Sequence, residues 1–118
     1  MIKICLADNY PIVHIALKSY FKDHVDISIV ANVSNFLMLK DTLLTKEIDV
    51  LVLDIELKGF TGISEIKSML KDFPKTKIII FSGLSEPIYD PNFIKMGVSG
   101  FVNKTEELET LAISILNV

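Results

Sequence analysis

Short apolar segments recur along the chain and alternate with longer segments of mixed character. Five of them are rich in β-branched and other hydrophobic residues, and they are Ile2–Ala7, Ile27–Val33, Val50–Leu53, Ile78–Phe81 and Gly100–Val102. The third and fourth segments are apolar without interruption, which is typical of central parallel strands that are covered on both faces. The pattern therefore predicts five β-strands.

The segments between these strands place hydrophobic residues three or four positions apart, which gives a helix one apolar face. Four such faces are Val13, Ala16, Leu17 and Tyr20; Phe36, Leu39 and Leu43; Ile63, Ile66, Leu70 and Phe73; and Leu108, Leu111, Ala112 and Ile115. Pro11 suits the first turn of the first helix, and Pro74 ends the third. A further short helix is expected over Pro91–Met96, ending at Gly97 because glycine favours helix C-termini.

Strands that alternate with helices predict right-handed βαβ units packed side by side. The expected fold is α/β, with a doubly wound parallel sheet of five strands between two layers that hold five helices. No internal repeat, low-complexity tract or linker interrupts the pattern, and 118 residues fit one domain. We therefore interpret residues 1–118 as a single domain.

Composition narrows the class of protein. Half of the residues are hydrophobic, which is enough for a core without disulfides, and the formal net charge of −3 gives no broad basic surface. We therefore expect no direct binding of nucleic acid by this domain. The single cysteine, Cys5, lies in an apolar strand and indicates a reducing compartment, the cytoplasm. No signal-peptide core or bilayer-length apolar stretch is seen, so no membrane association is expected.

Polar side chains follow the ends of four predicted strands. Asp8 and Asn9 follow the first strand, Asp54 the third, Ser82 the fourth and Lys104 the fifth. Ligands of open parallel sheets bind beyond the carboxyl ends of the strands, so these residues are expected to converge on one edge. Each residue alone has an ordinary explanation, such as a helix cap for an aspartate or a turn for the serine. Two aspartates that each end an apolar strand favour a functional site instead.

The whole chain resembles the receiver domain of response regulators in two-component signalling. Asp8-Asn9 resembles the acidic pair of that family, and the segment from Asp54 to Gly62 resembles its phosphoacceptor loop. Phe81-Ser82-Gly83 resembles its hydroxyl position, and Phe101-Val-Asn-Lys104 resembles its aromatic-x-x-Lys motif. The resemblance implies a flavodoxin-like sheet with the strand order 2-1-3-4-5.

The resemblance also implies a chemistry. Asp54 would be the phosphoacceptor, forming an aspartyl phosphate as a covalent intermediate. The cofactor would be Mg²⁺, which prefers hard oxygen ligands. Its ligands would be Asp8, Asp54 and the backbone carbonyl of Glu56, with a weakened contribution from the Asn9 side chain, because a neutral oxygen replaces a charged one.

Three further residues would respond to the phosphoryl group. Ser82 and Lys104 would bind its oxygens. Ser82 and Phe101 would form the switch that links the phosphorylated site to a distant interaction face. Phosphorylation would thereby shift an existing equilibrium between two packings of the fourth and fifth helical faces.

Several positions depart from the family's pattern. Asn9 stands where the family usually has a second acid, Lys58 replaces a usual proline, and Thr105 follows Lys104 where many members have proline. The absence of that last proline, together with Pro11 at the start of the first helix, is similar to the branch attached to helix-turn-helix DNA-binding regulators.

The main interpretation is a phosphorylatable signalling module, not a metabolic enzyme, whose donor is a histidine kinase, a phosphotransfer protein or a small phosphodonor. Asn9 keeps open the alternative of a degenerate receiver that acts as a phosphorylation-independent interaction module. A phosphatase with an aspartate nucleophile is a second alternative, although such enzymes typically carry an aspartate where this chain has Glu56. A C-terminal output domain beyond residue 118 and a homodimer formed on phosphorylation are also left open.

Overall fold

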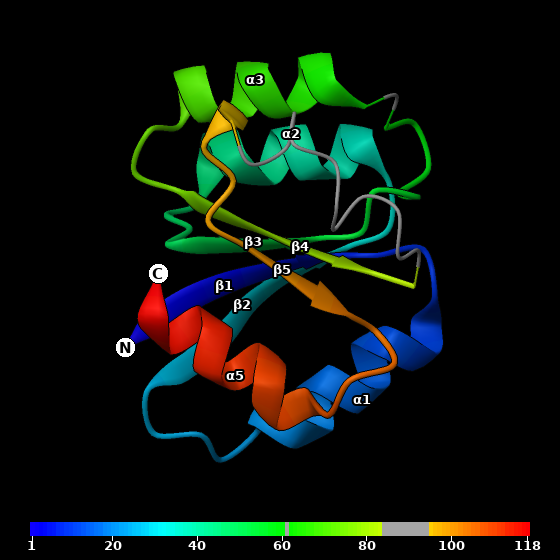
Figure 1. Cartoon of the computed structure of the whole chain (residues 1–118), viewed down its shortest axis with the longest axis vertical. Helices are drawn as coiled ribbons and strands as arrows, with labels where there is room; N and C mark the ends of the chain where they lie inside the picture. The colour runs from blue at the N-terminus through cyan, green and yellow to red at the C-terminus, as the bar shows by residue number, and fades with distance from the viewer. Residues whose placement is uncertain (61, 84–94) are drawn as a thin grey trace.

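A parallel sheet forms the centre of the computed structural model, which describes residues 1–60, 62–83 and 95–118 (Figure 1). Its strands are β1 (Ile2–Ala7), β2 (Ile27–Val33), β3 (Val50–Leu53), β4 (Lys77–Ser82) and β5 (Gly100–Asn103). The strand order is β2-β1-β3-β4-β5, and every adjacent pair is parallel. The predicted strand order is therefore confirmed, and only the ends of β4 and β5 differ slightly from the predicted bounds.

Helices cover both faces of this sheet, as Figure 1 shows. The helices α1 (Pro11–Phe21) and α5 (Leu108–Asn117) lie on one face, and α2 (Phe36–Thr45) and α3 (Ile63–Asp72) lie on the other. Most of the predicted fourth helix, Pro91–Met96, falls outside the described residues. Lys95 and Met96 are helical, and Gly97 has a φ of +100°, which agrees with a helix that ends there.

The core consists of two layers of buried side chains, one on each face of the sheet. Neighbouring strand residues point to opposite faces, so each strand contributes to both layers. Leu51 and Leu53 pack toward α2 and α3, whereas Val50 and Val52 pack toward α1 and α5. This double coverage explains why the sequence of β3 is apolar at every position.

The sequence signals for helix ends have clear structural counterparts. Pro11 occupies the first turn of α1, and α3 ends at Asp72, shortly before Pro74. Asn35 caps α2 by accepting a hydrogen bond from the Met38 N–H at 2.9 Å, an interaction that the apolar pattern did not predict. Across the described ranges, no helix has the length and apolarity needed to cross a bilayer.

Candidate functional site

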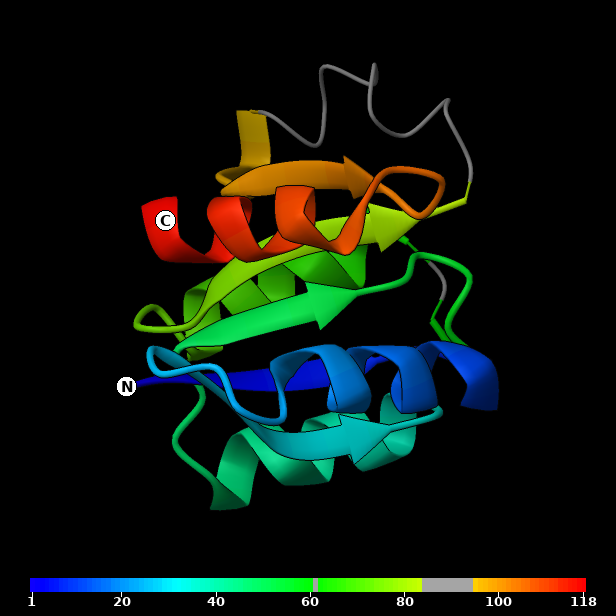
Figure 2. The ribbon, with the colours of Figure 1, turned by 90° about the horizontal axis from the view of Figure 1, so that it is seen from below.

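The two candidate acids lie side by side at the carboxyl edge of the sheet. The strands are all parallel, and Figure 2 shows the arrowheads of β2, β3, β4 and β5 pointing toward this same edge. Asp8 follows β1 and Asp54 follows β3, its neighbour in the sheet. The Asp54 N–H donates to the Ala7 carbonyl at 2.9 Å, and the Asp8 N–H donates to the Val33 carbonyl at 3.0 Å. Backbone hydrogen bonds to neighbouring strands thus fix both aspartates, and the residues Asp8 and Asp54 are 0% and 1% exposed.

Lys104 joins the two acids. Its Nζ lies 2.6 Å from Asp8 Oδ2 and 2.9 Å from Asp54 Oδ2, and its backbone N–H donates to the Ser82 carbonyl at 2.9 Å. Burial by itself lowers the pKa of the Lys104 ammonium, but hydrogen bonds to both acids and their negative charges outweigh it and raise that pKa above its ordinary value. The lysine is therefore a firmly charged partner for two buried carboxylates.

The remaining carboxylate oxygens accept hydrogen bonds from the backbone close by. Asp8 Oδ1 accepts from the Tyr10 N–H at 2.9 Å, and Asp54 Oδ1 accepts from the Glu56 N–H at 2.9 Å. Neither aspartate caps a helix, because the N-cap residue is Tyr10 in α1 and Gly62 in α3. The simple capping explanation for the two aspartates therefore does not apply.

Asn9 makes two contacts with the loop that follows Asp54. Its Oδ1 accepts a hydrogen bond from the Lys58 N–H at 2.7 Å, and its Nδ2 donates to the Glu56 carbonyl. Because Lys58 contributes an N–H at this point, only the amide oxygen of Asn9 can face it. The NH₂ group is consequently directed at Glu56. The end of β1 is thus tied to the loop after Asp54 through one side chain.

Ser82 and Phe101 occupy adjacent strands but different surroundings. Ser82 is the last residue of β4 and is fully buried. Phe101 is half-buried, pairs with Ile80 across β4 and β5, and packs against the core layer on the side of α2 and α3. The structure therefore brings Asp8, Asp54 and Lys104 into direct contact, ties Ser82 to Lys104 through the backbone, and places Phe101 next to the core.

Tyr10 is a residue at this site that the sequence pattern did not single out. The Lys104 Nζ lies 5.2 Å from the centre of its ring, within the range of a cation–π interaction. The Tyr10 side chain is 52% exposed, so its ring forms part of the outer wall of the site. The only sequence signal for this role was its position between Asp8 and Pro11.

The oxygen atoms at the site are of the chemical type that a hard divalent cation binds. Asp8 Oδ2, Asp54 Oδ2 and the Glu56 carbonyl are the ligand types that Mg²⁺ prefers. The part of the chain that the structure describes holds no cluster of three or more acidic, histidine or cysteine side chains that could hold a metal ion. Each of the three oxygens faces a donor of the protein, Lys104 or Asn9, which a cation would have to displace.

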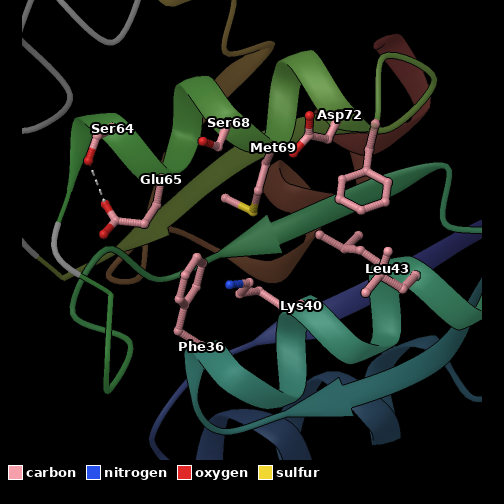
Figure 3. Close-up of a pocket in the computed structure, with 10 residues that line it drawn as sticks. Phe36, Lys40, Leu43, Ser64, Glu65, Ser68, Met69 and Asp72 are labelled. Atoms are coloured by element: carbon pink, nitrogen blue, oxygen red, sulfur yellow. Dashed lines mark hydrogen bonds between the residues drawn. The ribbon is translucent and has the colours of Figure 1, made fainter.

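A separate groove of about 500 Å³ lies between α2 and α3 (Figure 3). Its floor is apolar, and polar side chains such as Lys40 and Asp72 lie at its rim. None of the candidate site residues lines it. The candidate site and this groove therefore lie on different surfaces of the domain.

The fold and the site together define a class of protein. A doubly wound parallel sheet with the strand order β2-β1-β3-β4-β5 is typical of flavodoxin-like domains, which bind ligands at the carboxyl edge of the sheet. The model of the response regulator receiver domain matches residues 4–116, and the chain belongs to that family. Receiver domains of this family are signalling modules of two-component systems and generally bind Mg²⁺ at the phosphorylation site.

Two curated bacterial proteins illustrate the similarity of the chain to individual relatives. The transcriptional regulatory protein DesR of Bacillus subtilis is 33% identical over 118 residues, which cover 100% of this chain and 58% of DesR. The Fimbriae Z protein of Salmonella typhimurium is 28% identical over 108 residues, which cover 92% of this chain and 51% of that protein. The chain thus spans about half the length of the first curated relatives that it matches.

Solved structures show the same architecture. A DNA-binding response regulator of the LuxR family from Staphylococcus aureus superposes with a TM-score of 0.86 at 25% identity, covering 98% of this chain and 97% of that chain. The isolated REC domain of RcsB from Salmonella enterica serovar Typhimurium, solved with the phosphomimetic BeF₃⁻, superposes with a TM-score of 0.82 at 22% identity, covering 94% and 86%. The second likeness concerns the fold alone.

Proposed function

We propose that this chain is a phosphorylatable receiver in which Asp54 accepts the phosphoryl group. The observation that carries the proposal is the Lys104 ammonium between two buried carboxylates, 2.6 Å from Asp8 and 2.9 Å from Asp54. Such an arrangement gives the incoming phosphoryl oxygens a fixed cation next to the acceptor carboxyl group. The donor is a histidine kinase, a phosphotransfer protein or a small phosphodonor.

Each residue of the site has a part in this proposal. An Asp54 oxygen attacks phosphorus, and the bond from phosphorus to the donor breaks, leaving an aspartyl phosphate. The Glu56 N–H holds the other Asp54 oxygen, which orients the carboxylate. Lys104 pairs with a phosphoryl oxygen. Asp8, Asp54 and the Glu56 carbonyl would hold Mg²⁺, which when bound would offset the negative charge of the incoming phosphoryl group.

The response to phosphorylation is assigned to Ser82 and Phe101. Ser82 lies at the edge of the sheet near the acids, and Phe101 lies on the next strand against the core. In this proposal Ser82 hydrogen-bonds the phosphoryl group, and Phe101 moves into the space that the serine leaves. The two residues thereby change an interaction face, on which a homodimer forms.

The biological setting is part of the same proposal. DesR is named a transcriptional regulatory protein, and this chain covers 58% of its length. An output domain beyond residue 118 would then be the segment that binds DNA. We place the protein in the cytoplasm because its cysteine is unpaired and buried.

A degenerate receiver is the competing function, and Asn9 is the observation that favours it. The side chain supplies no charge to a cation and contacts the loop instead. The interaction module would then act without phosphate. The two candidates predict opposite results when the chain meets a phosphodonor.

The test is the intact mass of the protein after incubation with acetyl phosphate and Mg²⁺. Wild type should gain one phosphoryl group, and Asp54→Asn should gain none. Asp23→Asn is the matched control, because it removes an exposed acid far from the carboxyl edge, and it should behave as wild type. No mass gain in wild type would support the degenerate receiver, and an equal gain in Asp54→Asn would place the phosphoryl group elsewhere.

A further inference from the structure

Asn9 connects two parts of the site that are far apart in sequence. Its amide oxygen accepts from the Lys58 N–H at 2.7 Å, and its NH₂ group donates to the Glu56 carbonyl. The second contact covers the backbone oxygen that the proposed function assigns to the cation. An aspartate at this position could still accept from Lys58, but it has no N–H with which to cover Glu56.

We propose that the Asn9 side chain blocks the Glu56 carbonyl, so that a divalent cation binds there only after displacing the Asn9 amide. The inference rests on the proposed function in one respect, that the Glu56 carbonyl is a cation ligand. Asn9 thus weakens cation binding by competition and not only by lacking a charge. In the structure, the Lys104 ammonium faces the two acids and the Asn9 amide faces the Glu56 carbonyl.

The loop has enough other contacts to keep its shape without Asn9. Its first turn is held by the Asp54 side chain, which accepts from the Glu56 N–H, and by the Asp54 carbonyl, which accepts from the Leu57 N–H at 3.0 Å. The Lys58 carbonyl accepts from the Phe36 N–H at 2.8 Å, and the Leu57 side chain is 2% exposed. Removing the Asn9 amide should therefore uncover the carbonyl without releasing the loop.

The direction in which Asn9→Ala changes the affinity for Mg²⁺ distinguishes competition by the amide from the mere lack of a charge. If Asn9 merely fails to supply a charge, replacing it with alanine leaves Mg²⁺ binding unchanged or weakens it through the loss of an oxygen. If the amide blocks the carbonyl, alanine strengthens binding, because a water molecule on the carbonyl is displaced more easily than a fixed amide. Aspartate both uncovers the carbonyl and adds a charge, so it should strengthen binding further.

The experiment is calorimetric titration of the folded chain with Mg²⁺, without any phosphodonor. We expect Asn9→Ala to bind Mg²⁺ about three- to tenfold more tightly than wild type, the effect of one hydrogen bond. Asn9→Asp should bind more tightly than Asn9→Ala. Asn117→Ala, which removes an exposed asparagine at the far end of the chain, should match wild type. Equal or weaker binding by Asn9→Ala overturns the inference, and so does the absence of Mg²⁺ binding in every variant.

A second measurement on wild type avoids any dependence on the folding of the variants. The side-chain NH₂ signals of Asn9 in NMR spectra should exchange slowly with solvent in the cation-free protein and lose that protection when Mg²⁺ is added. Protection that persists at saturating Mg²⁺ overturns the inference. Because neither measurement involves phosphate, a chain that fails to accept a phosphoryl group but shows these responses refutes only the proposed function.

Discussion

Replacing Lys104 with methionine should destabilise the fold by about 3 kcal/mol at neutral pH. Its Nζ lies 2.6 Å and 2.9 Å from two carboxylate oxygens, and each pair is worth roughly 6 kcal/mol at an effective dielectric constant of about 20. Desolvation of the three groups offsets most of this attraction. Leaving a buried charge without its partner typically costs about 3–5 kcal/mol. Uptake of a proton by the two remaining carboxyl groups reduces the loss, so we expect the lower end of that range.

The pH dependence of this loss is a sharper test than its size. Without the lysine, Asp8 and Asp54 repel each other in the folded protein, and a proton bound at this edge relieves a repulsion that the unfolded chain lacks. The folded variant then binds more protons than the unfolded chain, so its stability increases as the pH falls. Lys104 itself has a raised pKa, so its contribution in wild type is complete below about pH 10 and declines only as the pH rises through the folded value. The difference between the two proteins should therefore narrow from pH 7 to pH 5.

Urea unfolding followed by circular dichroism at both pH values measures this difference. Lys58→Met is the matched control, because it removes an exposed lysine from the adjacent loop, and it should change the free energy of unfolding by less than about 0.5 kcal/mol. Two outcomes would refute the reasoning. One is a loss below about 1 kcal/mol for Lys104→Met at pH 7, within the range of an exposed ion pair. The other is a difference that widens as the pH falls.

Four further predictions concern other parts of the molecule. Ser82→Ala should accept a phosphoryl group but show a smaller change in self-association by analytical ultracentrifugation, and a response equal to wild type would place the coupling elsewhere. The isolated chain should not bind duplex DNA in fluorescence anisotropy, and salt-sensitive binding would contradict this. Gly59→Ala should lower the free energy of unfolding by about 1–2 kcal/mol, because Gly59 has a φ of +83° and an added Cβ would lie 3.4 Å from Phe36 Cβ; an unchanged urea midpoint would show that the turn relaxes. Burial raises the pKa of the Cys5 thiol to about 12. Iodoacetamide at pH 8 should therefore modify the folded protein far more slowly than the urea-unfolded chain. Comparable rates would indicate that β1 opens readily.

The amino-acid sequence by itself determined the architecture. The uninterrupted apolar run of Val50–Leu53 predicted a central strand, and the spacing of Val13, Leu17 and similar residues predicted the helices that cover it. These signals are local, because each follows from how often a side chain returns to the same face. The predicted convergence of Asp8 and Asp54 followed from topology, since parallel strands end at one edge of the sheet.

The contacts within the site depended on the tertiary structure. Asn9 and Lys58 are 49 positions apart, and Lys104 and Asp54 are 50 apart, so no local pattern relates them. The direction of the Asn9 amide depends on which backbone groups of the opposite loop are donors and which are acceptors. The position of the Tyr10 ring beside Lys104 likewise depends on how the end of β1 meets the segment after β5. Strand register and side-chain rotamers decide such contacts, because both are selected by packing across the whole fold and not by the periodicity of one segment.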